Sequence, residues 1–149
     1  MKTKITTLVL LAVIMTTSIF ASDKGDNKNT QVLAAFSSKF SSATEVSWDR
    51  AQDFLKATFK MNEQYMFAYY TEDGELVGVC RNINSTQLPL NLQVELKKVS
   101  SNSWITELFE YASENDNAYY VTIENADQQI QLKSTGYNTW SVYKKVKKN

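Results

Sequence analysis

The chain has 149 residues, of which 43% are hydrophobic and 21% are charged, and its 16 Lys and Arg balance its 16 Asp and Glu. This balance excludes the dense basic surface that nucleic-acid binding requires, so no nucleic-acid partner is expected. The chain has no His and one Cys, which excludes a His-based catalytic triad, a His-ligated zinc site and an internal disulfide or CxxC redox pair. We therefore expect a protein that is not an enzyme and that holds no metal and no cofactor.

The first 21 residues predict an export signal. Lys2 and Lys4 precede an uncharged run from Ile5 to Phe20, which is interrupted by Thr and Ser and is short for a membrane span. We interpret residues 1–21 as a signal peptide cleaved after Ala21 and residues 22–29 as a flexible linker. The protein is then periplasmic or secreted, and a membrane is involved only if this segment stays uncleaved as an anchor.

The next part of the sequence predicts one helix and four strands. Leu33, Phe36 and Phe40 recur at helical spacing and indicate a helix over residues 30–40. Alternating apolar and polar residues predict strands at 45–49, 54–61, 64–71 and 76–83. Tight turns are expected at Asn62-Glu63 and Asp73-Gly74.

The same order of elements follows a second time. A helix is expected to begin at Leu88-Pro89, with an apolar stripe of Leu92, Leu96 and Val99, and strands are expected at 104–111, 119–124, 129–134 and 139–146. We therefore predict an α+β fold made of a tandem repeat of two helix-plus-four-strand units, residues 30–87 and 88–149. The strands would form an antiparallel sheet with both helices on one face.

Several short motifs, taken in order, resemble a known family. They are Ala35-Phe36 leading to Phe40, then Val46-Ser47-Trp48, Ala57-x-Phe59, Ala68-x-Tyr70-x-x-Asp73-Gly74 and Leu88-Pro89. This series resembles the bacterial periplasmic PepSY-like proteins with a beta-lactamase-inhibitor-like fold, of the Bacteroidetes type. One departure is Ser41, because the family usually has Pro after the Phe that ends the helix. The resemblance implies a secreted, non-enzymatic domain of two repeats, but a shared fold does not identify a target.

The predicted turn at Asn62-Glu63 sets the pairing of the two strands that flank it. The apolar pairs, which should lie beneath the helices, are Leu55 with Tyr70, Ala57 with Ala68, and Phe59 with Met66. The outward pairs would be Lys56 with Tyr69, Thr58 with Phe67, and Lys60 with Tyr65. In the next strand the same alternation places Val77 and Val79 inward, and it places Cys80 on the open face as a half-exposed thiol.

The second half shows a similar alternation. The inward set is predicted to be Val121, Ile123, Ile130, Leu132, Trp140 and Val142, and the outward set Tyr120, Thr122, Gln131, Lys133, Tyr143 and Lys145. Trp48 and Trp140 are expected in the core, whereas the pattern does not establish which side Trp104 faces. Both halves of the open face thus carry aromatic residues together with lysines.

Aromatic side chains among long polar ones are typical of protein-recognition surfaces. We predict a binding face for a protein or peptide of the cell envelope, made of Lys56, Lys60, Tyr65, Phe67, Tyr69, Tyr120 and Tyr143. An inhibitor or chaperone of an envelope enzyme is one form that this function could take, and a monomer is expected. The alternatives are a sensor of a small ligand, glycan or lipid on the same face, ordinary stabilisation of the sheet, and self-association.

Overall fold

The computed structural model describes residues 30–136 and 138–148, which form one eight-stranded antiparallel sheet. Each strand pairs with its neighbour in the sequence, in the order β1 to β8. The strands are β1 (Thr44–Ala51), β2 (Phe54–Met61), β3 (Gln64–Tyr70), β4 (Leu76–Asn82), β5 (Trp104–Ala112), β6 (Asn117–Glu124), β7 (Gln128–Ser134) and β8 (Ser141–Lys147). The predicted signal peptide (1–21) and linker (22–29) lie outside the described residues.

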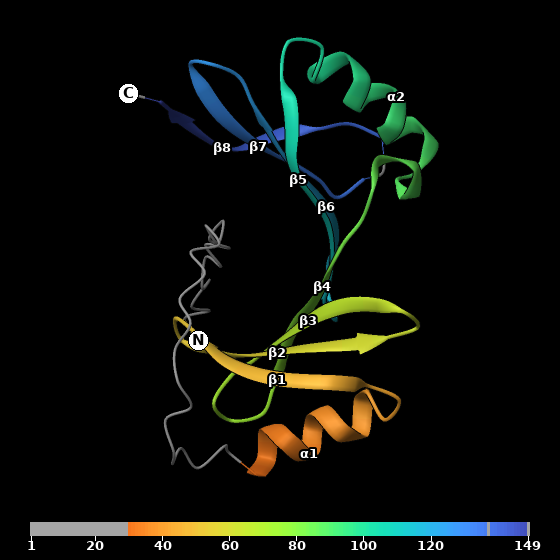
Figure 1. Ribbon diagram of the computed structural model, residues 1–149, viewed down its shortest axis with the longest axis vertical. Coiled ribbons are helices and arrows are strands. Elements are labelled where there is room, and N and C mark those ends of the chain that lie inside the picture. The colour runs from red at the N-terminus through yellow and green to blue at the C-terminus, as the bar shows by residue number, and fades with distance from the viewer. Residues whose placement is uncertain (1–29, 137, 149) are drawn as a thin grey trace, which may run out of the picture.

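Two short helices cover one side of this sheet. Helix α1 (Thr30–Lys39) precedes β1, and the 3-10 turn η1 (Ser85–Gln87) and helix α2 (Leu90–Val99) connect β4 to β5. Figure 1 shows the sheet bent into a C, with α1 and α2 on its outer, convex side near opposite ends. The opposite side of the sheet is concave, and we call it the concave face.

The predicted α+β tandem repeat of two helix-plus-four-strand units is wrong. The described residues form mostly one eight-stranded sheet, with two α-helices of only ten residues each. Strands β4 and β5 pair directly, from Val79 opposite Ala112 to Asn82 opposite Phe109, so the sheet continues where a boundary between two units was expected. The sequence pattern locates the elements, but backbone hydrogen bonds between segments about 30 residues apart decide how the strands assemble.

The predicted β2–β3 hairpin is confirmed. Asn62 and Glu63 have φ angles of 51° and 62°, as expected for the tight turn that best fits the twist of two paired strands. All predicted pairs are present, including Lys56 opposite Tyr69 and Lys60 opposite Tyr65. The observed bounds of β2 coincide with the predicted strand 54–61.

Helix α1 packs on β2 and β3 in the first hydrophobic core. Phe36 contacts Phe59 edge-to-face, with ring centroids 5.1 Å apart. Trp48 packs against the ring of Phe36, which confirms the predicted core position of Trp48. The buried positions of α1 are Val32 and Phe36, so the prediction of Leu33 was wrong. Both apolar stripes fit the helical period, and only the position of the sheet decides between them.

Helix α2 packs on β5, β6 and β7 in the second hydrophobic core. Leu92 and Leu96 are buried, and the indole nitrogen of Trp140 donates a hydrogen bond to the Leu92 carbonyl at 3.3 Å. Two predictions fail at the sheet edge, because Val142 is 64% exposed and Lys145 lies opposite Ile130, on the helix side. A register shift between β7 and β8 breaks the alternation and places Lys145 on the helix side. Val142 lies opposite Leu132, on the predicted side, but it stays exposed because β8 is the edge strand of the sheet.

The two halves of the sheet, β1–β4 and β5–β8, meet at the β4–β5 junction, where Tyr111 packs on Gly78. A methyl group at Gly78 would come within 2.4 Å of the Tyr111 ring, so the ring lies directly against the glycine. The Tyr111 hydroxyl donates a hydrogen bond to the Val77 carbonyl at 3.1 Å. Val77 is the extra residue of a β-bulge between β3 and β4, and for this reason Leu76, not Val77 as predicted, packs against the first core.

A polar network supports the convex side of the same junction. The Arg81 guanidinium donates to the Glu110 carboxylate at 2.6 Å and to the Gln64 side chain at 2.9 Å. The Tyr119 hydroxyl donates to the other carboxylate oxygen of Glu110 at 3.3 Å. The half-buried pair of Arg81 and Glu110 therefore links β3, β4, β5 and β6 between the two hydrophobic cores.

Replacing Gly78 by Ala tests the junction. We expect Gly78→Ala to lower the free energy of unfolding by about 1–3 kcal/mol, because the added methyl group overpacks the Tyr111 ring. The matched control is Gly136→Ala, where a methyl group meets nothing within 4 Å. The measurement is urea denaturation followed by circular dichroism. Equal stability of the two variants would contradict the proposed close packing.

Candidate functional site

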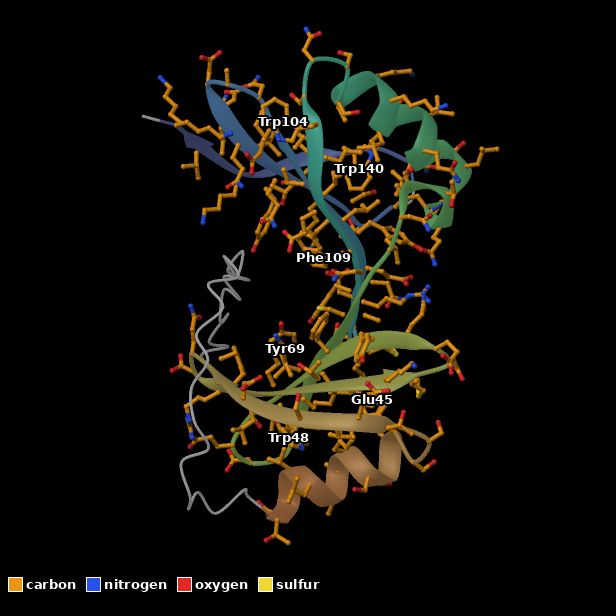
Figure 2. The ribbon with its side chains drawn as sticks, in the orientation of Figure 1. Glu45, Trp48, Tyr69, Trp104, Phe109 and Trp140 are labelled. Atoms are coloured by element: carbon orange, nitrogen blue, oxygen red, sulfur yellow. The ribbon has the colours of Figure 1, made fainter. Side chains whose placement is uncertain are left out.

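All seven residues predicted to bind a partner lie on the concave face. Lys56, Lys60, Tyr65, Phe67 and Tyr69 alternate with the buried residues of β2 and β3 that pack beneath α1. Tyr120 and Tyr143 come from β6 and β8, and their rings contact each other edge-to-face with centroids 5.4 Å apart. Figure 2 shows Tyr69 and Phe109 on this side of the sheet, whereas Trp48 and Trp140 lie toward α1 and α2.

The centre of the concave face is a closed layer of aromatic side chains, which we call the floor. It consists of Cys80, Phe109, Tyr111, Ala118 and Tyr120, all of which are buried. Phe109 and Tyr120 lie opposite each other on β5 and β6, and their rings stack with centroids 5.0 Å apart and an interplanar angle of 12°. The expectation that Tyr120 is open to solvent is wrong, because it is only 6% exposed. The bend of the sheet brings these side chains together, so they bury one another without a helix above them.

Four further aromatic residues surround this floor, and we call them the rim: Tyr65, Phe67, Tyr69 and Tyr143. Phe67 and Tyr69 pack against the floor and are half-buried. Tyr65 and Tyr143 are 54% and 38% exposed. The structure therefore gives the floor a role in packing and leaves rim rings available for contact with another molecule.

The lysines of this face are held by neighbouring side chains. The Lys56 ammonium lies 4.6 Å from the centroid of the Phe67 ring, and the Lys60 ammonium lies 3.2 Å from a carboxylate oxygen of Glu63. The Lys133 ammonium is 3.1 Å from Asp116 and 5.5 Å from the centroid of the Tyr120 ring. These contacts balance much of the positive charge locally and orient the aliphatic stems along the aromatic layer.

Tyr65 is oriented by a carboxylate. Its hydroxyl donates a hydrogen bond to Glu45, which has a φ angle of 53° within a bulged part of β1. This hydrogen bond to Glu45, strengthened by the negative charge of the carboxylate, raises the pKa of Tyr65. Tyr65 thus stays protonated and presents one side of its ring at the end of the β2–β3 hairpin.

Sequence reasoning missed Glu107, Phe109 and Tyr111, which β5 contributes to the concave face. A register shift between Ile105 and Glu107 interrupts the alternation at the start of β5, so the pattern did not show which side this strand presents. Glu107 is half-buried and accepts a hydrogen bond from the Thr122 hydroxyl at 3.2 Å. The predicted outward residues Thr122 and Gln131 lie on this face but are buried.

Cys80 is also buried, at 6% exposure, so the prediction of a half-exposed thiol was wrong. Burial raises the pKa of this thiol to about 12. Burial likewise raises the pKa of Tyr69 to about 12, and Cys80 and Glu107 add to this effect. The thiol of the floor and the phenol of the rim residue Tyr69 therefore stay protonated at neutral pH.

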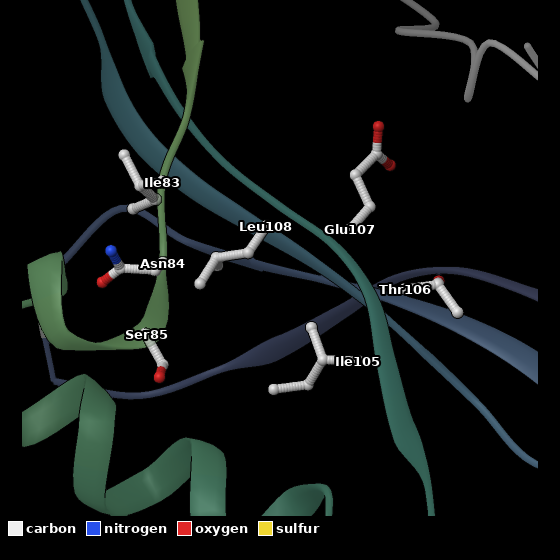
Figure 3. Close-up of a pocket in the computed structure, with 7 residues that line it drawn as sticks. All are labelled: Ile83, Asn84, Ser85, Ile105, Thr106, Glu107 and Leu108. Carbon is white, nitrogen blue, oxygen red and sulfur yellow. The ribbon is translucent and has the colours of Figure 1, made fainter. Parts of the chain in front are cut away.

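A separate groove of about 250 Å³ lies where β4 leaves the sheet and β5 begins. It is lined by Ile83, Asn84, Ser85, Ile105, Thr106, Glu107 and Leu108. Figure 3 shows the side chains of Ile83, Ile105 and Leu108 on the side of η1 and α2, and Glu107 directed away from them. None of the seven predicted binding residues lines this groove.

The chemistry available on the concave face is that of contact and recognition. It offers aromatic rings, hydroxyl groups, lysines and carboxylates. Within residues 30–136 and 138–148, no three Cys, Asp or Glu side chains gather as metal ligands do. Neither helix in this part of the chain is long and apolar enough to cross a membrane.

No protein-family model and no curated protein matches the chain. Solved structures nevertheless share its fold. A DUF2874 family protein from Bacteroides ovatus matches with a TM-score of 0.72 at 16% identity, over 83% of this chain and 89% of that chain. A BLIP-like protein from Bacteroides fragilis matches with a TM-score of 0.71 at 14% identity, over 84% and 91% of the two chains.

A third structure, from Bacteroides eggerthii, is described provisionally as periplasmic and matches with a TM-score of 0.70 at 13% identity, over 84% and 90% of the two chains. At these identities the likeness shows the fold alone. The expected beta-lactamase-inhibitor-like fold is thereby confirmed. The PepSY part of the resemblance, the signal peptide and the target stay predictions.

The burial of Cys80 predicts a specific loss of stability at alkaline pH. Because the pKa of the folded thiol, about 12, exceeds the ordinary value of 9.0, the unfolded chain loses this proton first as the pH rises. The contribution of the buried thiol to the free energy of unfolding is complete below pH 9. It decreases between pH 9 and 12, by ~1 kcal/mol per pH unit. The free energy of unfolding is measured by urea denaturation at pH 8 and at pH 11. Between these two pH values, Cys80→Ala should lose less of this free energy than the native protein. An identical loss in both proteins would contradict the assignment.

Proposed function

We propose that this protein is a non-enzymatic binding module of the periplasm or the extracellular space, which engages a protein or an extended peptide through the concave face. The observation that carries this proposal is the arrangement of exposed rim rings around a buried aromatic floor. Tyr65 and Tyr143 are substantially exposed. On the same face, Phe109 and Tyr120 are buried and belong to a hydrophobic core.

A rigid aromatic surface is well suited to binding. The rim rings rest on side chains that are already packed, so little conformational freedom is lost when a partner covers them. Aromatic residues on such a surface supply much of the binding free energy at protein interfaces. The concave shape adds contact area around any protruding segment of the partner.

Stabilisation of the sheet explains only part of the aromatic content. It accounts for Phe109, Tyr111 and Tyr120 in the floor, and in part for Phe67 and Tyr69. It accounts for the Tyr65 hydroxyl, which bonds to Glu45 of β1, but not for the ring, because 54% of this residue is exposed. The BLIP-like name of a structural neighbour supports an inhibitor as one specific form of this function.

The hypothesis of a ligand, glycan or lipid sensor stays a prediction. The groove beside β5 lies on the helix side and lacks the predicted aromatic residues, so no observation favours it as a site for stacking on sugars. Membership of the PepSY-like family, the monomeric state and an envelope enzyme as the target also stay part of the proposal.

Site-specific photo-crosslinking in the native cell tests the proposed face. A photoreactive phenylalanine analogue at Tyr65 or at Tyr143 should give a discrete adduct with one partner. The same analogue at Leu90 or Val94, exposed apolar residues of α2 on the convex side, should give none. Adducts from the α2 positions alone, or from no position, would contradict the concave face as the binding site. Adducts with a second copy of the chain would favour self-association.

Removal of rim rings should weaken the captured complex. Tyr65→Ala combined with Tyr143→Ala is expected to lower the affinity by at least about tenfold, because both rings are lost from the contact area. The fold should persist, since both side chains are substantially exposed. The affinity is measured by calorimetry with the captured partner, and thermal unfolding is the control. Unchanged affinity in a folded variant would contradict the proposal.

A further inference from the structure

The half-buried acidic residues of the described part of the chain form ion pairs, with one exception. These residues are Glu95, Glu107, Glu110, Asp116 and Glu124. Four of these five carboxylates form an ion pair. The pairs are Glu95 with Lys98 at 2.6 Å, Glu110 with Arg81 at 2.6 Å, Asp116 with Lys133 at 3.1 Å, and Glu124 with Lys148 at 2.8 Å. Among the described residues, Glu107 alone in this group has no cationic partner.

The surroundings of Glu107 place its charge on the concave face. It is the first residue of β5 to pair with β6 after the register shift, opposite Thr122. Its carboxylate accepts one hydrogen bond, from the Thr122 hydroxyl at 3.2 Å, and so keeps free acceptor capacity. Thr122 alternates with the convex-side residues Val121 and Ile123 of β6, so Glu107, its partner, faces the concave side. Figure 3 shows the side chain directed away from the helix side of β5.

Lys56 does not supply the missing charge. Its ammonium is occupied above the Phe67 ring, at 4.6 Å from the centroid. Lys133, the other concave lysine nearby, is paired with Asp116. A negative charge that is partly removed from water and unpaired is unfavourable, and the other four half-buried carboxylates avoid this cost by pairing. A cation brought by a bound molecule would complete the fifth pair.

We propose that the concave face recognises a Lys or Arg side chain of its protein partner, with Glu107 as the anion. Phe109 follows Glu107 by two residues on the same strand, so both side chains belong to the same face. This inference rests on the proposed function, because it names the chemistry of the partner at the proposed face.

The test is selection from a random 12-residue peptide library displayed on phage. The immobilised proteins are the native protein, expressed from its full coding sequence, and Glu107→Gln, which keeps the size and the hydrogen-bonding oxygen of the side chain. Glu114→Gln is the matched control, since Glu114 is an exposed carboxylate in the turn between β5 and β6. Equal melting temperatures of the three proteins verify that each is folded.

The expected result is enrichment of peptides that share a Lys or Arg at one position, by the native protein and by Glu114→Gln but not by Glu107→Gln. A synthetic version of an enriched peptide should bind Glu107→Gln at least about 30-fold more weakly than it binds the native protein. Replacing the basic residue of the peptide by Gln should weaken its binding to the native protein by a similar factor. The same replacement should have little effect on binding to Glu107→Gln, because the interacting pair is already broken.

The outcomes separate this inference from the proposed function. Enriched peptides without a shared basic residue, or equal enrichment by Glu107→Gln, would overturn the role of Glu107 and leave the concave face as a binding surface. Failure of the native protein to enrich any peptide above Tyr65→Ala combined with Tyr143→Ala would count against the binding face itself, and the role of Glu107 would fall with it.

Discussion

The packing of the Tyr111 ring on Gly78 is the contact on which the concave face depends. Strands β4 and β5 share only four residue pairs, yet they join the part of the sheet beneath α1 to the part beneath α2. Tyr111 strengthens this narrow junction through ring contact with Gly78 and through a hydrogen bond to the carbonyl of the bulged Val77. A larger residue at 78 would displace the ring and, with it, the aromatic layer that continues through Phe109 and Tyr120.

The two sides of the sheet are built differently, and we propose that one stabilises the fold and the other binds a partner. On the convex side, each helix closes a separate hydrophobic core, and the pair of Arg81 and Glu110 connects the strands between the cores. On the concave side, the bend of the sheet lets aromatic side chains bury one another without a helix. The interior of that layer is a third core, while its edge leaves Tyr65 and Tyr143 exposed. A rigid support for exposed rings is what a binding surface requires.

Charge on the concave face is arranged in local pairs. Lys60, Lys133 and Lys148 each lie within 4.0 Å of a carboxylate, and Lys56 lies above an aromatic ring. The carboxylate of Glu107, which has no cationic partner among the described residues, is the exception, and in the proposed role it would favour a partner that brings a cation.

Local signals in the sequence were sufficient for the hairpin and the alternation around it. Asn62 and Glu63 set the turn, the turn sets the register, and the register assigns Phe67 and Tyr69 to one face and Ala57 and Phe59 to the other. Only the tertiary structure decided the order of the strands and the direct pairing of β4 with β5, since this pairing is a long-range contact. It also decided that Cys80 and Tyr120 are buried and that Glu107 lacks a cation, because bulges and the bend of the sheet bring together side chains whose neighbours no local pattern can specify.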